Sequence, residues 1–296
     1  MESEESIYMT DLVSVIIPAY NREKTIRDSI FSVLEQSYKN IEVLVVDDMS
    51  TDGTVEVIKS IHDDRVRLIC HEKNRGACAA RNTGVKGAKG TFIAFNDSDD
   101  LWRPDKLEKQ MIAFEERNAD VVFCKLERHN YDYGEKVFPN LKEGFVDYIT
   151  LAVKSKCSTQ TIVAKKAVFD EFLFDETLPR MQDYDFVIRV AKTKKFYFVD
   201  ECLVDVYLQP NSITTKDIRK RYEICKILYD RHQDVCQKYP EFEIHFLESI
   251  GYFQVKLGLD SFPAYSRLYD LNPNLKNLFK KLLSKTGLLK VLWANK

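Results

Sequence analysis

The first hundred residues alternate between short apolar runs and longer segments in which apolar residues recur every three or four positions. The apolar runs are rich in β-branched residues, and they predict buried strands at 13–18, 41–48, 66–70 and 91–95. Helical spacing predicts helices at 23–36, 55–61 and 76–88. This alternation predicts β-α-β units, and therefore an α/β, Rossmann-like fold with a mostly parallel sheet flanked by helices.

Polar side chains follow each predicted strand. They are Tyr20 and Asn21, Asp47 and Asp48, Asn74 and Arg75, and the run from Asp97 to Asp100. Ligands of open parallel sheets bind outside the carboxyl ends of the strands. We therefore expect these residues along one edge of the sheet, as a single site.

Beyond Trp102 the pattern changes. Residues 104–117 predict a helix, residues 144–210 alternate short helices and strands, and the chain reads as helical from about Ser212. We therefore expect a main domain over 1–210 and a helical C-terminal extension over 211–296.

Composition narrows the class of protein. The net charge of −2 over 296 residues argues against a nucleic-acid partner. No run approaches the roughly 18 apolar residues of a membrane span. The acidic N-terminus is unlike a secretory signal, and seven cysteines without a C-x-x-C pair fit a reduced, cytoplasmic protein. The five histidines lie far apart, which does not favour a zinc site.

Three carboxylates, Asp97, Asp99 and Asp100, follow the fourth strand within four residues. Carboxylate oxygens are ligands suited to Mg²⁺ and Mn²⁺, so this segment is a candidate metal site. The alternative is that Asp99 or Asp100 caps the next helix, but the β-α-β context favours the metal. Asp47 and Asp48 hold the equivalent place after the second strand, where a carboxylate can accept hydrogen bonds from a nucleobase.

The stretch NRGACAARNTG (74–84) places Arg75 and Arg81 among small residues. Arginine binds phosphate as a bidentate donor, and small side chains let the backbone approach a ligand. On its own, the stretch is better explained by an Ala-rich helix with two exposed arginines. The chain has no Walker loop here, and no G-x-G-x-x-G follows the first strand.

Five stretches in register resemble the family 2 glycosyltransferases, which have the A-type glycosyltransferase fold. They are VSVIIPAYNRE (13–23), IEVLVVDDMSTDGT (41–54), NRGACAARNTG (74–84), FNDSDDLWRPDKLEKQ (95–110) and QDYDFVIRV (182–190). The resemblance covers about residues 12–210. It implies a catalytic domain with nucleotide-sugar binding over about 12–103 and an acceptor side over about 104–210.

The resemblance also implies a role for individual residues. Asp48 would meet the base, usually uracil, and Asp97 and Asp99 match the D-x-D motif that holds Mn²⁺ or Mg²⁺, with Asp99 in direct contact. Asp183 matches the second residue of an E-D motif and would be the catalytic base that deprotonates the acceptor. Donor contacts are implied for Pro18, Tyr20, Glu23, Asp48, Arg75, Arg81, Asp97 and Ser98.

Two positions depart from the family pattern. Gln182 replaces the glutamate that usually precedes the base, so Asp185 is kept as the alternative base. The same stretch also reads as an amphipathic helix with an acidic first turn. Gln209 stands where many relatives carry a histidine, so the accessory role of that histidine is not carried over.

The tail, residues 275–296, contains six lysines and no acidic residue. Such a basic amphipathic helix can lie in an anionic membrane interface, as a peripheral membrane contact. Packing on the catalytic domain, or on a second subunit in a homodimer, explains it equally well. Its apolar stripe consists of Leu275, Leu278, Phe279, Leu282, Leu283, Leu289, Leu292 and Trp293.

The resemblance implies a metal-dependent, inverting transferase that moves a sugar from a nucleotide donor, with a UDP-sugar favoured, to a saccharide or lipid-linked acceptor. We expect it in the cytoplasm, at the inner face of the cell membrane, in surface polysaccharide synthesis for the cell envelope. The alternatives are a sugar-nucleotide-binding protein with little catalysis and a metal-dependent nucleotidyltransferase. A nucleotidyltransferase would typically show a Gly-rich, basic loop after the first strand, which is absent here.

Overall fold

The computed structural model describes residues 10–129, 136–154, 157–207, 217–286 and 288–289. The chain forms two compact units. Unit 1 contains residues 1–177 and 182–209, and unit 2 contains residues 178–181 and 210–296. Within the described ranges, no helix combines the length and the apolar character needed to cross a bilayer.

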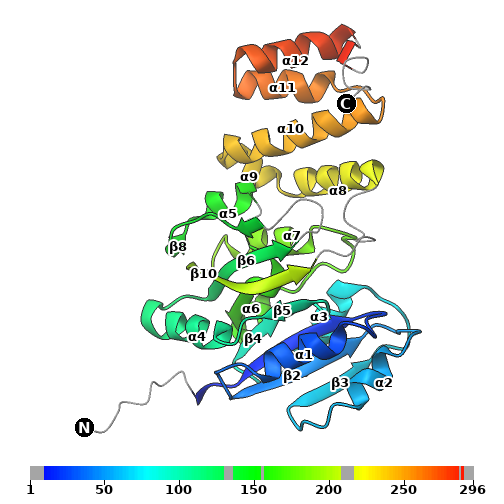
Figure 1. Cartoon of the computed structure of the whole chain (residues 1–296). Helices are drawn as coiled ribbons and strands as arrows, with labels where there is room; N and C mark the ends of the chain where they lie inside the picture. Colours follow the sequence, from blue (N-terminus) through cyan, green and yellow to red (C-terminus); the bar gives the residue numbers. More distant parts are fainter. Residues whose placement is uncertain (1–9, 130–135, 155–156, 208–216, 287, 290–296) are drawn as a thin grey trace. The chain divides into compact units, whose positions relative to one another are not determined.

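Unit 1 is built on a single ten-stranded sheet (Figure 1). Its strands are β1 Val13–Ala19, β2 Ile41–Asp47, β3 Val66–Cys70, β4 Phe92–Phe95, β5 Asp100–Trp102, β6 Val121–His129, β7 Lys136–Phe138, β8 Gly144–Val146, β9 Ile162–Lys165 and β10 Phe196–Tyr207. They pair in the order β3-β2-β1-β4-β9-β6-β10-β5, with β7 on β6 and β8 on β10. Six strands (β1, β2, β3, β4, β6 and β10) run in one direction, which confirms the mostly parallel sheet.

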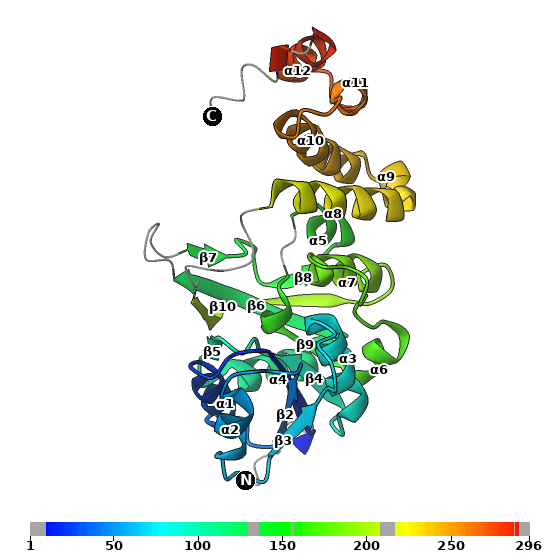
Figure 2. The ribbon, with the colours of Figure 1, turned by 90° about the vertical axis from the view of Figure 1, so that its right-hand side faces the viewer.

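Helices cover both faces of this sheet, as expected for buried parallel strands. One face carries α1 Ile26–Leu34, α2 Thr54–Lys59 and α4 Lys106–Arg117. The other face carries α3 Ala77–Gly87, α5 Tyr148–Lys154, α6 Lys166–Glu171 and α7 Gln182–Val190. Figure 2 shows α1 and α2 on one side of the strands and α3, α6 and α7 on the other.

Strand β1 shows why the apolar runs are continuous. Val13, Val15 and Ile17 belong to the core beneath α1 and α4, whereas Ile16 belongs to the core beneath α3. Both faces of the strand are therefore buried, and a polar residue on either face would lose its water.

The strand order places a topological switch point at β1. The chain runs from β1 to β2 and β3 on one side, and then returns to β4 on the other side of β1. Crevices at the carboxyl ends of strands that flank such a point are the usual ligand sites of open α/β sheets. The acidic segment 97–100 lies directly after β4, at this point.

The structure adds elements that the apolar pattern did not reveal. Residues 100–102 form the short strand β5, which pairs antiparallel with β10 through Leu101 and Asp205. A three-residue strand is too short to show a two-residue period. Strand β5 matters because it fixes the far end of the acidic segment: the segment begins after β4, which pairs with β1 and β9, and ends in β5, which pairs with β10.

Unit 2 is helical in its described residues, which confirms the helical C-terminus. Its helices are α8 Ile218–Arg231, α9 Gln233–Lys238, α10 Pro240–Lys256, α11 Phe262–Leu271 and α12 Leu275–Thr286. Its buried side chains include Leu228, Phe242, Phe246 and Tyr265. Gly251 allows α10 and α11 to approach closely, because a Cβ there would lie 2.6 Å from Cε1 of Tyr265.

Candidate functional site

The loops that follow β1 and β2 are joined by hydrogen bonds. Asn21 accepts from the Thr51 backbone N–H at 2.8 Å, and Glu23 accepts from the Gly53 backbone N–H at 3.2 Å. Asn21 and Met49 both have positive φ, 53° and 64°, a conformation that clusters at functional sites. These two loops therefore form one rigid surface at the sheet edge.

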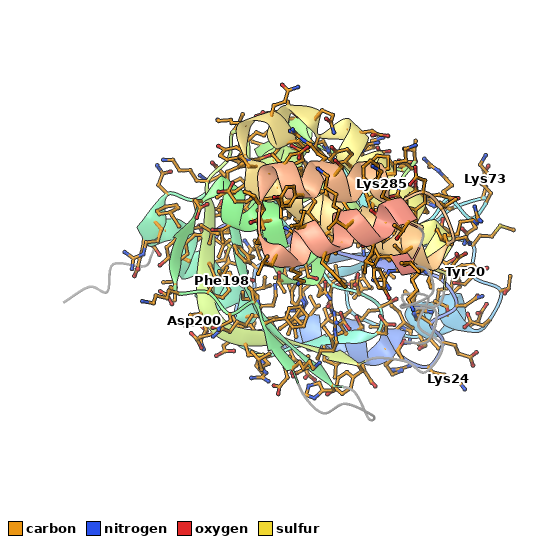
Figure 3. The ribbon with its side chains drawn as sticks, turned by 90° about the horizontal axis from the view of Figure 1, so that it is seen from above. Tyr20, Lys24, Lys73, Phe198, Asp200 and Lys285 are labelled. Atoms are coloured by element: carbon orange, nitrogen blue, oxygen red, sulfur yellow. The ribbon has the colours of Figure 1, made fainter. Side chains whose placement is uncertain are left out.

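Tyr20 and Pro18 differ in accessibility. Tyr20 is exposed at the end of β1, whereas Pro18 is buried inside the strand, opposite Val46. In Figure 3, Tyr20 and Lys73, which follow β1 and β3, lie on the same side of the molecule, and Asp200 lies on the opposite side. Tyr20 is therefore free to contact a ligand directly, while Pro18 can only shape the floor of the loop.

Asp48 is buried at the end of β2 and is held by the loop after β3. Its Oδ1 lies 2.7 Å from Nδ1 of His71 and accepts from the Arg75 backbone N–H at 2.8 Å. Its Oδ2 accepts from the Gly76 backbone N–H at 2.6 Å. Gly76 has a φ of 87°, so its backbone conformation is one that side chains disfavour. Asp48 therefore fixes this loop, and Oδ2 retains capacity to accept one further hydrogen bond.

The acidic segment after β4 is positioned by two buried side chains. Asn96 donates to Oγ of Ser29 at 3.0 Å and to the Asp100 carbonyl at 3.3 Å. Ser29 in turn donates to the Asp97 carbonyl at 3.0 Å. Ser98, between the two aspartates of the motif, is buried. The backbone of this segment is thereby fixed from within the fold.

Two arginines face the acidic segment. Arg81 lies on α3 and is buried, and it donates to Oδ1 of Asp97 at 2.7 Å. Arg22 lies 3.5 Å from Oδ2 of Asp99. The second oxygen of each carboxylate takes no part in these ion pairs. Both aspartates are only partly buried, so those oxygens can reach a ligand.

Three carboxyl groups at this site have raised pKa values. Burial is the largest cause at Asp99 and Asp100, and the nearby Asp97 charge raises the pKa of both further. Burial also raises the pKa of Asp183, where Arg81 opposes and Asp97 adds to the shift. Carboxyl groups perturbed by burial and by each other are typical of functional sites.

Asp183 lies in the first turn of α7, within electrostatic reach of Arg81 and Asp97. It therefore shares one electrostatic environment with the D-x-D segment, although 86 residues separate Asp97 and Asp183 in the chain. Asp185, the alternative base, is fully buried, and Arg189 Nε lies 2.8 Å from its Oδ2. Asp183 is half-buried, whereas Asp185 is enclosed by the protein. Gln209 lies outside the described residues.

The acidic segment supplies oxygen ligands of the kind that a divalent cation takes. Asp97, Asp99 and Asp100 stand within four residues of one another in the sequence. Burial, and after it the nearby Asp97 charge, raises the pKa of Asp99 and Asp100. Hard oxygen ligands with excess negative charge are what Mg²⁺ and Mn²⁺ prefer. Asp97 and Asp99, which retain oxygens outside their ion pairs, are the residues that would hold it.

Arg75 is positioned by a residue that the motifs did not indicate. It donates to Oε2 of Glu176 at 3.0 Å, and Asn82 donates to Oε1 of the same carboxylate at 3.1 Å. Asn82 also exchanges hydrogen bonds with the backbone of Phe174 in both directions. The loop around Glu176 is thereby attached to α3, next to Arg81.

Arg22, His71 and Glu176 all contact predicted site residues without having been singled out in the sequence. Arg22 stands between Tyr20 and Glu23 in the first motif, so its neighbours in the sequence could have identified it as a site residue. His71 and Glu176 carry no such signal, because their contacts with Asp48 and Arg75 arise only from the fold.

A second polar cluster lies at the carboxyl ends of β6 and β10. Glu127, His129 and Asp205 place potential metal-ligand atoms within 4.8 Å of one another. Arg103 pairs with Glu127 at 2.6 Å and with Asp205 at 3.1 Å, and thereby supplies a positive charge to the cluster. The cluster joins β5, β6 and β10, and it shares no residue with the D-x-D segment.

Comparison with known proteins gives one family and one fold. The model of glycosyl transferase family 2 matches residues 14–178. The Escherichia coli UDP-Glc:α-D-GlcNAc-diphosphoundecaprenol β-1,3-glucosyltransferase WfgD is 39% identical over 165 residues, which are 55% of this chain and 64% of WfgD. The chain spans only 35% to 64% of the length of three curated relatives, WfgD among them.

Two solved structures share the fold. Staphylococcus aureus TarS 1–349 in complex with UDP-GlcNAc has a TM-score of 0.64 and 21% identity, covering 92% of this chain and 79% of that chain. The Pyrobaculum calidifontis mannosyltransferase PcManGT, in complex with GDP-Man and Mn²⁺, has a TM-score of 0.61 and 17% identity, covering 96% of this chain and 88% of that chain.

Proposed function

The chain belongs to glycosyl transferase family 2, and we propose that it is a metal-dependent, inverting glycosyltransferase. Its donor is a UDP-sugar, and its acceptor is a saccharide or a lipid-linked saccharide. The reaction belongs to surface polysaccharide synthesis, and the enzyme works in the cytoplasm at the inner face of the membrane. UDP is favoured because WfgD and TarS, which resemble this chain, are named for or bound to UDP-sugars.

One observation carries this proposal. The D-x-D carboxylates, the buried Arg81 and the half-buried Asp183 share one electrostatic environment at the sheet edge, where ligands of such folds bind. A transferase needs both a place for a diphosphate and a proton acceptor beside it. This cluster supplies both, and a simple binding protein would not require Asp183.

The base and ribose of the donor fit the loops after β1, β2 and β3. Asp48 Oδ2 accepts an imide N–H of uracil, while His71 and the amide of Arg75 hold Oδ1 in place. Tyr20 contacts the base or ribose from the exposed end of β1, with Pro18 and Glu23 shaping the loop around it. Arg75 and Arg81 face the ribose and diphosphate, where planar guanidinium groups match phosphate oxygens.

The acceptor hydroxyl attacks the anomeric carbon from the face opposite the diphosphate, which inverts that centre. Asp183 takes the hydroxyl proton as the new C–O bond forms and the bond to the diphosphate oxygen breaks, releasing UDP. Positioned base assistance of this kind is typically worth about 10²–10⁴ in rate. A divalent cation held by Asp97 and Asp99 would neutralise charge on the departing diphosphate. Arg81 adds a fixed positive charge at the same place.

Calorimetric titration with UDP, in the presence and absence of Mn²⁺, tests the donor site. We expect binding that depends on the metal, followed by release of UDP when a UDP-sugar and an acceptor are supplied. Binding of GDP but not UDP would keep the family and reject the uracil contact at Asp48. Metal-dependent UDP binding without turnover of any UDP-sugar would favour the binding-protein alternative, and absence of all nucleotide binding would reject the proposal.

A further inference from the structure

Helix α12 packs on unit 2 through its polar side. Lys281 lies 3.4 Å from Asp270 and 5.0 Å from the centre of the Tyr269 ring, both on α11. Lys280 lies 3.7 Å from Glu248 on α10. Asn277 is buried and donates to the Asn272 carbonyl at 2.9 Å. Amphipathic helices normally bury their apolar side, so this orientation is the reverse of the usual one.

The opposite side of α12 is apolar and exposed. Leu275, Phe279 and Leu282 are 85%, 60% and 55% exposed. They are spaced by four and three residues, so they lie on one face of the helix. Leu278 and Leu283 beside them are half-buried, and Leu288 continues the exposed set beyond α12. We call Leu275, Phe279 and Leu282 the α12 apolar face.

Three members of the stripe expected from sequence do not belong to the described exposed face. Leu289 is buried, so it does not extend the α12 apolar face. Leu292 and Trp293 lie outside the described residues. Of the expected stripe beyond Gly287, the described residue Leu289 is therefore not part of the exposed face.

The charge around this face is positive. Lys276 and Lys285 are exposed on α12, and residues 275–296 contain no acidic residue. An exposed apolar face bordered by lysines matches a surface that is apolar beneath a negatively charged layer, such as an anionic lipid membrane. A second copy of the chain fits less well, because a two-fold contact through this face would bring the same lysines together.

We propose that α12 docks unit 2 onto an anionic lipid membrane, with Leu275, Phe279 and Leu282 inserted below the headgroups. Lys276 and Lys285 then lie at headgroup level, where each exposed lysine strengthens binding about fivefold. The side chains of Lys280 and Lys281 remain with Glu248 and Asp270, so the helix inserts without leaving the unit that carries it. This docking does not depend on the proposed transferase activity.

Co-sedimentation of the full chain with vesicles tests the proposal. Vesicles of phosphatidylglycerol and phosphatidylcholine should bind the protein, and vesicles of phosphatidylcholine alone should bind it much less. Phe279→Glu should abolish binding to the anionic vesicles, because it puts a charge into the apolar layer. Lys276→Gln combined with Lys285→Gln should weaken binding roughly 25-fold, which is two steps of about fivefold.

Ile227→Glu is the matched control, since it makes the same change at an exposed apolar residue of α8 in unit 2. It should leave vesicle binding unchanged. Thermal unfolding of Phe279→Glu provides a second readout, because an exposed face loses little stability on substitution.

Each contrary result overturns the proposal in a recognisable way. Equal binding by the parent and by Phe279→Glu would show that another surface binds lipid. Absence of binding to anionic vesicles, together with a dimer in light scattering that Phe279→Glu dissociates, would assign the α12 apolar face to a second copy. Absence of vesicle binding, with strong destabilisation by Phe279→Glu, would show that this face packs within the protein.

Discussion

At the scale of single residues, the site brings together carboxyl groups whose charged form is destabilised by the fold. Burial is the largest cause of the raised pKa at Asp99, Asp100 and Asp183. A carboxyl group whose pKa is higher in the folded state favours folding at low pH, and this contribution disappears as the pH rises through that pKa. At neutral pH the cluster therefore costs stability, and such a cost is commonly retained where it serves a function.

Asp183→Asn should remove transfer while leaving donor binding intact. The amide cannot take the acceptor proton, so we expect kcat to fall about 10²–10⁴-fold. Folding should be unaffected or slightly improved, because the substitution removes a partly buried charge whose pKa is raised. Single-turnover assays at saturating UDP-sugar, with calorimetric titration of UDP as the control, measure the two effects separately. Turnover equal to that of the parent would show that another group is the base.

The pH dependence of the parent tests the same assignment. The base must be deprotonated, so kcat should increase with pH through the raised pKa of Asp183, above the usual value of 3.8. The increase of kcat with pH on the acidic side should be absent from the pH profile of the residual activity of Asp183→Asn. An increase that persists unchanged in this variant would belong to a different group.

Asp99→Asn should remove most of the metal dependence of UDP binding. We expect the effect of Mn²⁺ on UDP affinity to fall at least tenfold, since changes even to outer-shell partners of metal ligands typically cost about 10–100-fold. Asp64→Asn is the matched control, because Asp64 is exposed in the turn before β3, at the opposite edge of the sheet. Mn²⁺-dependent UDP affinity that is equal in the parent and in Asp99→Asn would place the metal elsewhere.

The sequence indicated which residues carry charge at the site, but not what holds them. Asp48, Asp97 and Asp99 stand out because each follows a buried strand. The partners of these carboxylates depend on contacts between distant segments: His71 on Asp48, Arg81 on Asp97 and Arg22 on Asp99. A local pattern contains no information about such pairs, which only the fold brings together. The roles of these residues toward a donor stay predictions.

At the scale of elements, the apolar runs located the first four strands, of which β1, β2 and β4 are buried on both faces and β3 is half-buried. Strands β1 to β4 and helices α1 to α3 fall where the apolar runs and the helical spacing placed them. The short antiparallel strand β5 (Asp100–Trp102) was not predicted, and β8 (Gly144–Val146) was not located within the stretch 144–210 that was expected to alternate helices and strands. Three residues cannot display a period, and their strand character comes from pairing with β10.

The contact between α3 and β1 depends on a glycine. A Cβ at Gly84 would overlap the side chain of Ile16, which is fully buried in β1. Gly84→Ala should therefore destabilise unit 1 by about 1–3 kcal/mol, as overpacking of a core typically does. Urea unfolding should show a lower midpoint with an unchanged m-value.

Gly87→Ala on the same helix is the control for helix propensity. A Cβ there would lie 3.2 Å from Ile69 and 3.3 Å from Leu44, contacts with side-chain tips that can shift slightly. The gain in helix propensity is up to about 1 kcal/mol, so this variant should stay close to the parent. Combining Ile16→Ala with Gly84→Ala should cost less stability than the sum of the two single losses, because the smaller side chain removes the overlap; strictly additive losses would contradict it.

At the scale of the whole molecule, the proposed donor site lies in unit 1, whose buried Trp102 follows the acidic segment within β5. The ammonium of Lys106 lies 3.7 Å from the centre of the Trp102 ring. The chain contains two tryptophans, so Trp293→Phe leaves Trp102 as the single fluorescent reporter of unit 1. This background allows the unfolding of the unit that carries the site to be followed directly.

In the Trp293→Phe background, UDP with Mn²⁺ should raise the Tm reported by Trp102. A ligand at 100 times its Kd stabilises the folded state by about 2.7 kcal/mol. For a unit of this size, that corresponds to a rise in Tm of about 5–10 °C. The rise should require both components, because the carboxylates of Asp97 and Asp99 meet the diphosphate only through a cation. Adding Asp99→Asn should remove the metal-dependent part of the rise and leave any effect of UDP alone. A rise of equal size without Mn²⁺ would mean that Arg22 and Arg81 hold the diphosphate unaided.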